Sequence, residues 1–287
     1  MQLSELLAGG AEKLEQAGIE SAMVDAELLA AFVLKVSRGE LQSMIFTNAT
    51  LTDSQVESIT TLLEKRAERV PLQHITGVAH FRNLTLAVGN GVFIPRPETE
   101  GVAELAINAL RQVPETPVAV DLCTGSGAIA IAMATEVPQA EVFAWELNPA
   151  SEQYLRKNIA ANNAGVELVM GDIAAEHELF AELAGRVDVV VSNPPYIPNW
   201  AIPRDVEVHL HDPKLALYGG DDGMDVMRVV SRRALQLLKP GGFLVVEHAD
   251  DQARIVADLL LSDGWRQVRS HQDLTGRDRS VTAVKAF

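Results

Sequence analysis

The spacing of apolar side chains separates a helical first quarter of the chain from a longer part in which strand and helix patterns alternate. In residues 1 to about 70, apolar residues recur three and four positions apart, as at Ala26, Leu29 and Ala30, which is the spacing of one helix face. Pro71 closes this region, because proline cannot continue a helix. The pattern predicts a small bundle of helices.

Residues 72–94 have the pattern of a β-hairpin. Residues 74–76 and 84–88 are rich in apolar and β-branched side chains and are separated by turn-forming residues. We expect these two runs to be paired strands that link the helical bundle to the rest of the chain. Pro97 then suits the first turn of a helix.

From Val118 onward, short apolar runs alternate with helical patterns. The expected strands cover residues 118–122, 141–145, 166–170, 187–192, 243–247, 266–269 and 281–286. Such alternation predicts parallel strands joined by right-handed crossovers. The expected fold is therefore α/β: a doubly wound, mainly parallel seven-stranded sheet, preceded by a small N-terminal helical bundle and a linking β-hairpin.

This pattern divides the chain into three expected parts. Residues 1–71 form the helical domain, residues 72–94 the hairpin linker, and residues 95–287 the domain built on the sheet. A loop over residues 193–222 follows the fourth strand of that sheet. Loops of this length are uncommon in a compact domain unless they serve a function.

The composition is that of a globular protein and disfavours nucleic acid as a direct partner. The 287 residues are 47% hydrophobic and 22% charged, which is ordinary for a folded domain. The formal net charge is −15, from 39 acidic and 24 basic residues. Nucleic acids are bound largely through Lys and Arg that neutralise phosphates, so no direct nucleic-acid partner is expected.

Cysteine and histidine usage excludes a disulfide framework and gives no metal site. Cys123 is the single cysteine, and the nearest pair of histidines, His209 and His211, lies in the long loop. The first residues lack the pattern of a signal peptide. No apolar run reaches the roughly 20 residues needed to cross a bilayer. We expect a cytoplasmic protein with no membrane contact and no bound metal.

The segment Asn193-Pro194-Pro195-Tyr196 carries the most specific chemistry. It follows the apolar run 187–192 directly, so it falls at the carboxyl end of a parallel strand, where ligands bind in open α/β sheets. Two prolines fix the backbone and so fix the direction of the Asn193 amide and the neighbouring carbonyl. Rigid acceptors beside an aromatic ring suit a planar –NH2 group, which fits methyl transfer to an amide or amine nitrogen.

A glycine-rich turn and two further acids mark a cofactor site. Asp121 ends the first strand and precedes a turn that contains Gly125 and Gly127, where glycines let the backbone approach a ligand. An acid at this place would repel a pyrophosphate but accept bonds from a cationic amino-acid ligand, which favours S-adenosylmethionine over NAD. Glu146 and Asp172 end the next two strands, where acids suit ribose hydroxyls and an adenine amino group.

These motifs resemble those of the bacterial peptide chain release factor glutamine N(5)-methyltransferases, over the full length of the chain. The resemblance rests on four segments: Ile94-Pro95-Arg96-Pro97-Glu98-Thr99-Glu100, Asp121-Leu122-Cys123-Thr124-Gly125-Ser126-Gly127, Asn193-Pro194-Pro195-Tyr196-Ile197-Pro198, and the loop 212–223. It implies a class I, Rossmann-like methyltransferase domain and a helical domain that recognises the substrate. Asp212 and Tyr218 depart from the usual residues of that loop, and Ile173 replaces an aromatic seen in some relatives.

The resemblance also implies the ligands. The cofactor is S-adenosyl-L-methionine, with S-adenosyl-L-homocysteine as product, and the substrate is the glutamine of the Gly-Gly-Gln tripeptide in class I release factors. Apart from the resemblance, we expect the protein to be a monomer. The cofactor-binding residues that it implies are Asp121, Cys123, Thr124, Gly125, Ser126, Gly127, Glu146, Leu147, Asp172, Ile173 and Asn193.

The substrate amide is expected to be held by the strand-end motif itself. The Asn193 side-chain oxygen and the Pro194 carbonyl would accept its two N–H groups, Pro195 would fix the turn, and Tyr196 would pack along the flat amide. These four residues form the expected catalytic set. Arg96 and Glu98 are expected to line the substrate mouth, or alternatively to form a salt link between domains.

Three other functions stay open at this point. A sister family methylates a glutamine of a ribosomal protein and shares the Asn-Pro-Pro-Tyr motif, and so do adenine methyltransferases of nucleic acid. A binding module that kept the cofactor fold without catalysis is the third. The acidic composition disfavours the nucleic-acid enzyme, and the intact motif disfavours the inactive module.

Overall fold

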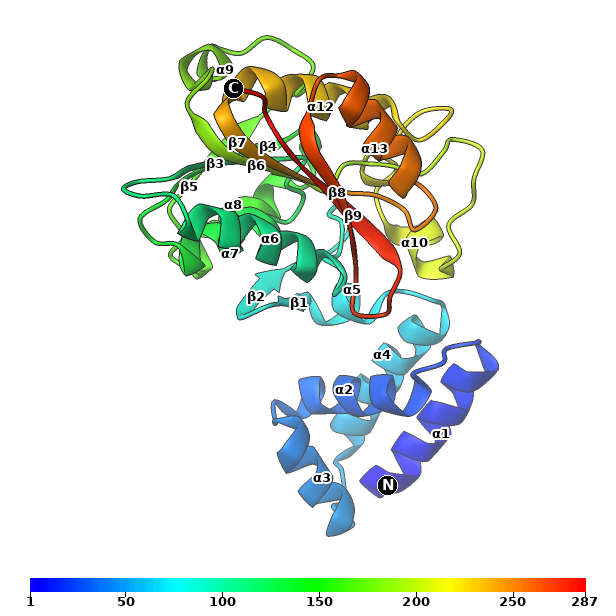
Figure 1. Ribbon diagram of the computed structural model, residues 1–287. Helices are drawn as coiled ribbons and strands as arrows, with labels where there is room; N and C mark the ends of the chain where they lie inside the picture. Colours follow the sequence, from blue (N-terminus) through cyan, green and yellow to red (C-terminus); the bar gives the residue numbers. More distant parts are fainter. The chain divides into compact units, whose positions relative to one another are not determined.

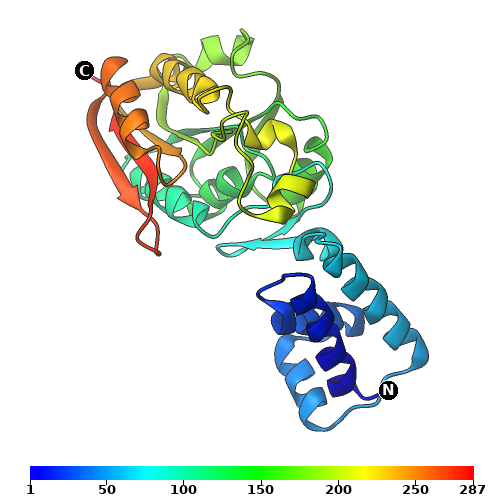
Figure 2. The ribbon, with the colours of Figure 1, turned by 90° about the vertical axis from the view of Figure 1, so that its right-hand side faces the viewer.

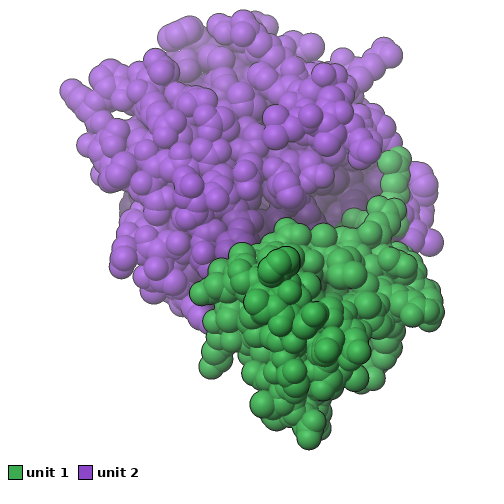
Figure 3. All heavy atoms as spheres, turned by 90° about the horizontal axis from the view of Figure 1, so that it is seen from below, with its two compact units in different colours: residues 1–78, 204–211 green, residues 79–203, 212–287 purple.

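The computed structural model describes residues 1–287 and divides into two compact units, coloured separately in Figure 3. The first comprises Met1–Val78 and the segment Arg204–His211, and the second comprises Ala79–Pro203 and Asp212–Phe287. None of the helices in either unit combines the length and the apolar character needed to cross a bilayer.

The first unit is a bundle of helices around its own apolar core. Its helices are α1 (Leu3–Gln16), α2 (Ala22–Leu34), α3 (Arg38–Phe46), α4 (Asp53–Ala67), α5 (Leu72–Thr76) and α10 (Val206–His211). Leu3, Leu29 and Ile59 are fully buried where α1, α2 and α4 meet. The predicted helical bundle is therefore confirmed.

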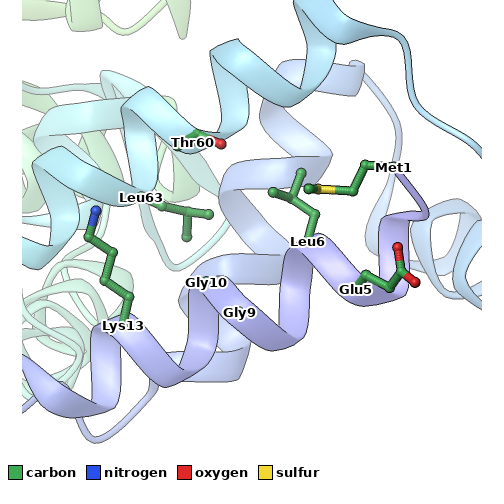
Figure 4. Close-up of a pocket in the computed structure, with 8 residues that line it drawn as sticks. All are labelled: Met1, Glu5, Leu6, Gly9, Gly10, Lys13, Thr60 and Leu63. Carbon is green, nitrogen blue, oxygen red and sulfur yellow. The ribbon is translucent and has the colours of Figure 1, made fainter.

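A shallow pocket of about 190 Å³ opens between α1 and α4 (Figure 4). Its lining residues are Met1, Glu5, Leu6, Gly9, Gly10, Lys13, Thr60 and Leu63. A Cβ on Gly10 would lie 2.7 Å from Leu63 Cδ1, so the glycine lets the two helices approach closely.

The expected strand over residues 74–76 is wrong, because these residues lie in helix α5. Pro71 is the N-cap of α5, and Gly77, with φ of +74°, ends it in the left-handed region that favours glycine. The hairpin is shorter than expected and consists of β1 (Val78–Phe81) and β2 (Leu84–Ala87). Local apolar spacing alone did not separate a short helix from a strand here.

The second unit is built on a seven-stranded sheet with strand order β5-β4-β3-β6-β7-β9-β8. Its strands are β3 (Val118–Leu122), β4 (Glu141–Glu146), β5 (Val166–Met170), β6 (Val187–Ser192), β7 (Leu238–Glu247), β8 (Arg266–Gln272) and β9 (Asp278–Val284). The pairs among β3 to β7 are parallel, and β9 runs antiparallel to both neighbours. The predicted doubly wound, mainly parallel seven-stranded sheet is confirmed.

Helices cover both faces of this sheet (Figures 1 and 2). The helices of this unit are α6 (Thr99–Arg111), α7 (Ala128–Glu136), α8 (Glu152–Ala161), α9 (Glu178–Leu183), α11 (Lys214–Leu217), α12 (Asp225–Leu237) and α13 (Ala253–Ser262). One core joins the sheet to α6 and α7, and a second joins its other face to α9, α12 and α13. Because both faces are covered, every residue of β3 and β6 is buried.

The segment expected as a long loop after β6 is more ordered than predicted. It contains the short helices α10 and α11, and Ile197 forms a parallel bridge with Tyr218. Within the first unit, the Glu207 carboxylate of α10 accepts hydrogen bonds from Arg66 Nη1 at 2.9 Å and Arg69 Nη2 at 2.6 Å. These contacts depend on charged residues far apart in sequence, which local periodicity does not reveal.

Candidate active site

The carboxyl ends of β3, β4 and β6 meet in register. Leu122 of β3 lies opposite Trp145 on one side and Ser192 on the other, and the Ser192 hydroxyl donates to the Leu122 carbonyl oxygen at 2.6 Å. The residues that follow these strands, among them Asn193, therefore leave the sheet side by side. This is the edge of a parallel sheet at which ligands bind.

Asn193 has its side chain oriented by a residue from another element. Its Nδ2 donates to the hydroxyl of Thr99, the first residue of α6, at 3.4 Å. Asn193 is half-buried, and its Oδ1 accepts no hydrogen bond from the chain. With the nitrogen engaged, the oxygen is the free end of this amide. Its role as an acceptor for the substrate stays a prediction.

Pro195 and Tyr196 are held against a glycine-rich stretch of the following segment. Ile197 N–H donates to Leu217 O, and Gly219 N–H donates to Ile197 O, both at 2.9 Å. The Tyr196 carbonyl oxygen accepts from Gln252 Nε2 at 2.9 Å. These bonds fix the turn from both sides, so the rigidity expected from the two prolines is reinforced by later parts of the chain.

The Tyr196 hydroxyl lies beside a buried carboxyl group. It donates to Glu247 Oε1 at 3.4 Å, and Glu247 at the end of β7 is 2% exposed. Burial and the Glu247 carboxylate raise the pKa of Tyr196. Burial in turn raises the pKa of Glu247 to about 7, although the Thr99 hydroxyl and Arg279 oppose this shift. This site thus contains a carboxyl group that titrates near neutral pH.

The glycine-rich turn after β3 keeps an acid and an open backbone together. Asp121 Oδ2 accepts from the Thr124 hydroxyl at 2.6 Å and from Ala130 N–H at 3.2 Å, while its Oδ1 is buried without a partner. Burial raises the pKa of Asp121 to about 7. Gly125 has φ of +59°, and no other atom lies within 4 Å of where its Cβ would be. The turn therefore offers a spare acceptor and empty space.

Gly127 has a packing role. A Cβ there would lie 2.4 Å from Leu155 Cδ1, and φ is +85°, so glycine allows α7 to begin close to α8. Ser126 is buried, and its carbonyl oxygen accepts from Asn158 Nδ2 at 2.9 Å. Cys123 has φ of +65°, and burial raises the pKa of its thiol, which keeps it protonated at neutral pH.

Glu146, at the end of β4, binds the neighbouring backbone. Its Oε2 accepts from Gly125 N–H at 2.8 Å and its Oε1 from Asn148 N–H at 2.7 Å. Burial raises the pKa of Glu146, and these two hydrogen bonds oppose the rise. A carboxylate has about four acceptor positions, so Glu146 can tie the two strand ends together and still accept bonds from a ligand.

Of the two residues that follow Gly171 after β5, Asp172 is exposed and Ile173 is buried. Asp172 is exposed, and its Oδ1 accepts from Ala174 N–H at 2.8 Å, while Ile173 is buried at 7% exposure. Leu147, next to Glu146, is 51% exposed. An exposed apolar side chain beside two acids suits a flat ligand with polar edges.

Arg96 and Glu98 take different places near Tyr196. Arg96 Nη2 forms an ion pair with Asp212 Oδ2 at 2.6 Å, and the Asp212 side chain is 1% exposed. Both residues belong to the second unit, so this pair is not the salt link between domains that was the alternative. Arg96 is close enough to favour the ionised form of Tyr196, and Glu98 raises the pKa of Glu247.

Three residues of this site were not predicted from the sequence: Thr99, Glu247 and Gln252. Glu247 carries the same signal as the other acids, because it ends an expected strand of the sheet. Thr99 lies within the segment 94–100, but its sequence neighbours give no sign of its contact with Asn193. Among His, Cys, Asp and Glu, no group of three comes together in a way that could hold a metal ion.

Comparisons with known proteins identify the domains of this chain. The family profile described as the methyltransferase small domain matches residues 83–210, and that of the PrmC N-terminal domain matches residues 5–77. A methyltransferase of Pyrococcus furiosus has a similar fold, with a TM-score of 0.52 and 21% identity over 72% of this chain and 91% of that chain. The profile identifies a methyltransferase domain in this chain, and the solved structure shares its fold.

Curated relatives narrow the class to one family. The release factor glutamine methyltransferase of Streptomyces coelicolor is 45% identical over 286 residues, which cover 98% of this chain and 97% of the relative. The enzyme of the same name from Mycolicibacterium smegmatis is 46% identical over 95% of this chain and 94% of the relative. The chain belongs to the release factor glutamine methyltransferase family.

Proposed function

We propose that this enzyme transfers a methyl group from S-adenosyl-L-methionine to the side-chain amide nitrogen of the glutamine in the Gly-Gly-Gln tripeptide of class I release factors. The observation that carries this proposal is Asn193: its amide nitrogen is engaged by Thr99, and its oxygen is left as an acceptor at the carboxyl edge of the sheet. Membership of the family supports the choice of substrate.

The residues at the neighbouring strand ends fit the proposed cofactor. Asp121 Oδ1 is a buried acceptor without a partner, which suits the cationic amino group of the cofactor's amino-acid part. Glu146 suits the ribose hydroxyls, and the open space in front of Gly125 lets a ligand approach the backbone. We assign Asp172, Ile173 and the exposed Leu147 to the border of the adenine. When bound, S-adenosyl-L-methionine supplies a methyl group on a positively charged sulfur.

The chain's own contribution to the reaction is orientation of a weak nucleophile. An amide nitrogen is a poor nucleophile because its lone pair is delocalised into the carbonyl. Asn193 Oδ1 and the Pro194 carbonyl oxygen accept the two N–H groups of the substrate glutamine, which turns the nitrogen toward the cofactor side and stabilises positive charge as it develops. Pro195 fixes the turn, and Tyr196 packs along the flat amide.

Arg96 contributes a substrate-binding role beside this turn. Its side chain is 31% exposed in the ion pair with the buried Asp212, so part of this side chain faces solvent. Glu98 is half-buried and lies close enough to Glu247 to raise its pKa. We assign both residues to the mouth through which the tripeptide enters, and the helical first unit to recognition of the rest of the release factor.

The test is incubation with methyl-labelled S-adenosyl-L-methionine and a purified class I release factor. We expect label in the wild-type release factor and none in a release factor whose tripeptide glutamine is changed to alanine. Label retained after that change would place methylation elsewhere and contradict the proposed target. If the label appeared instead in ribosomal protein or in nucleic acid, with none in the release factor, that molecule would be the substrate and the proposed target would be wrong.

A further inference from the structure

Glu247 is a buried carboxyl group that the proposed reaction does not use directly. It ends β7, and register places Val246 opposite Ser192 of β6, so Glu247 and Asn193 leave adjacent parallel strands at the same level. Glu247 Oε1 accepts from the Tyr196 hydroxyl at 3.4 Å, and its Oε2 is buried and makes no hydrogen bond of standard geometry. A buried carboxyl group with a spare oxygen requires an explanation.

Thr99 connects Glu247 to Asn193. The Thr99 side chain is buried, its hydroxyl accepts from Asn193 Nδ2, and it lies close enough to Glu247 to lower the pKa of that carboxyl group. A hydroxyl has one proton to donate. While its oxygen accepts from Asn193, that proton is free to point at the Glu247 carboxylate, which can only accept.

The direction of this chain of hydrogen bonds decides which end of the Asn193 amide meets the substrate. An ionised Glu247 can only accept a hydrogen bond, so the Thr99 hydroxyl donates its proton to Glu247. The Thr99 oxygen can then only accept, and it therefore binds the NH2 end of the Asn193 amide and not the oxygen end. We propose that Glu247 is a positioning residue that, through Thr99, fixes Asn193 with its oxygen toward the substrate amide. This inference rests on the proposed methylation of a glutamine amide.

Other charged groups face Glu247 from the elements packed around it. Glu98, just before α6, raises the pKa of Glu247, and Arg279 of β9 lowers it. Arg279 is engaged by Asp273 at 3.4 Å, and burial dominates, with a resulting pKa of about 7. When Glu247 takes up a proton it can donate to Thr99, the hydroxyl is then free to donate to the Asn193 oxygen, and the orientation is lost.

The first test is a measurement that does not depend on activity. The side-chain amide signal of Asn193 is assigned in the NMR spectrum of 15N-labelled protein as the one missing from Asn193→Ala. We expect this signal to shift with pH, with a midpoint near 7, and to lose that shift in Glu247→Gln and Thr99→Val. Thr99→Ser keeps the hydroxyl and should retain it. Asp188→Asn changes another buried carboxyl group, at the opposite end of β6, and should leave the titration intact.

The second test uses kinetics with the release factor and saturating cofactor. We expect kcat of the wild type to fall as pH drops below about 7, and kcat of Glu247→Gln and Thr99→Val to be at least tenfold lower at pH 8 and flat with pH. The Kd for S-adenosyl-L-methionine should be unchanged, and Thr99→Ser should restore most of kcat. A wild-type pH profile and kcat in Glu247→Gln, with an Asn193 signal that does not titrate, would overturn the inference. No methylation by the wild type would instead overturn the proposed function, while the NMR titration would still decide the role of Glu247.

Discussion

Gly219 and Pro195 are packed so closely that a Cβ on the glycine would lie 2.5 Å from the Pro195 carbonyl oxygen. Gly223 stands in the same relation to Tyr196, whose carbonyl oxygen lies 2.3 Å from the place of a Cβ. Both obstacles are backbone atoms, so rotation of a side chain cannot relieve the contact. The two glycines therefore allow the segment that contains Gly219 and Gly223 to pack against the backbone of the Asn-Pro-Pro-Tyr turn.

Gly219→Ala should consequently displace the turn that carries the proposed catalytic residues. We expect kcat with the release factor to fall at least tenfold, because small misplacement of an orienting group is costly, while the Kd for S-adenosyl-L-methionine changes little. Gly165→Ala is the matched control, since nothing lies within 4 Å of its Cβ and its φ is ordinary. Equal activity of Gly219→Ala and Gly165→Ala would show that the close contact does not support the site.

Asn193→Ala should abolish methylation while leaving cofactor binding in place. Removing one positioned hydrogen-bonding group from a reacting centre typically costs about 10²–10³ in kcat. Asn193 is half-buried and its Nδ2 makes one bond of 3.4 Å, so little stability should be lost. Calorimetry with S-adenosyl-L-methionine and a labelled-methyl assay measure the two effects separately. Methylation near the wild-type rate by this variant would refute the role of Asn193.

The fold could be predicted largely from the sequence because its strands are buried on both faces. β3 and β6 are largely apolar runs bounded by turn residues, so their existence and ends followed from the local sequence pattern. The short helices α5, α10 and α11 were missed, because four to six residues carry too little periodicity to identify a helix. α3 did have a signal, since Ser37 and Glu40 form a reciprocal capping box.

The site was predicted only as far as it is local in sequence. Asp121 and Glu146 lie at the ends of apolar runs, and Asn193 directly follows one; the order of the strands then brings them together. Thr99 reaches Asn193 across 94 positions of the sequence, and Glu247 reaches Tyr196 across 51. Those contacts depend on the order of strands in the sheet and on the placement of α6, which alternation of strands and helices does not specify.

Gly125→Ala should weaken cofactor binding by occupying the space in front of the glycine-rich turn. Gly125 has φ of +59° with nothing near its Cβ position, and Gly185 shares both features with φ of +69° in the loop before β6. Each alanine should cost about 1–2 kcal/mol of stability, because the left-handed region disfavours a Cβ. Only Gly125→Ala should raise the Kd for S-adenosyl-L-methionine, by at least tenfold in calorimetry. The same Kd in both variants would contradict the placement of the cofactor at this turn.

The buried ion pair between Arg66 and Asp25 should dominate the electrostatic contribution to stability of the helical unit. Arg66 Nε lies 2.7 Å from Asp25 Oδ2, and both side chains are at most 8% exposed. Arg66→Met leaves a buried carboxylate without its partner and should cost roughly 3–5 kcal/mol in urea unfolding. The double variant Asp25→Leu with Arg66→Met should recover most of this loss. Arg38→Met removes an exposed arginine from a pair with Glu27 and should change stability by less than about 1 kcal/mol.

Glu247→Gln should lower activity and yet stabilise the protein at alkaline pH. The pKa of Glu247 is raised from 4.5 to about 7 in the folded state, so between these values the folded protein binds more protons than the unfolded chain. Its contribution to stability therefore falls as pH rises through that window and is least favourable above pH 7. Glutamine carries no charge to bury, so the variant should gain on the wild type by up to roughly 3 kcal/mol at pH 8 and not at pH 4.5. Thermal unfolding at the two pH values measures this difference, and an unchanged gap between variant and wild type would mean that Glu247 is already ionised without penalty.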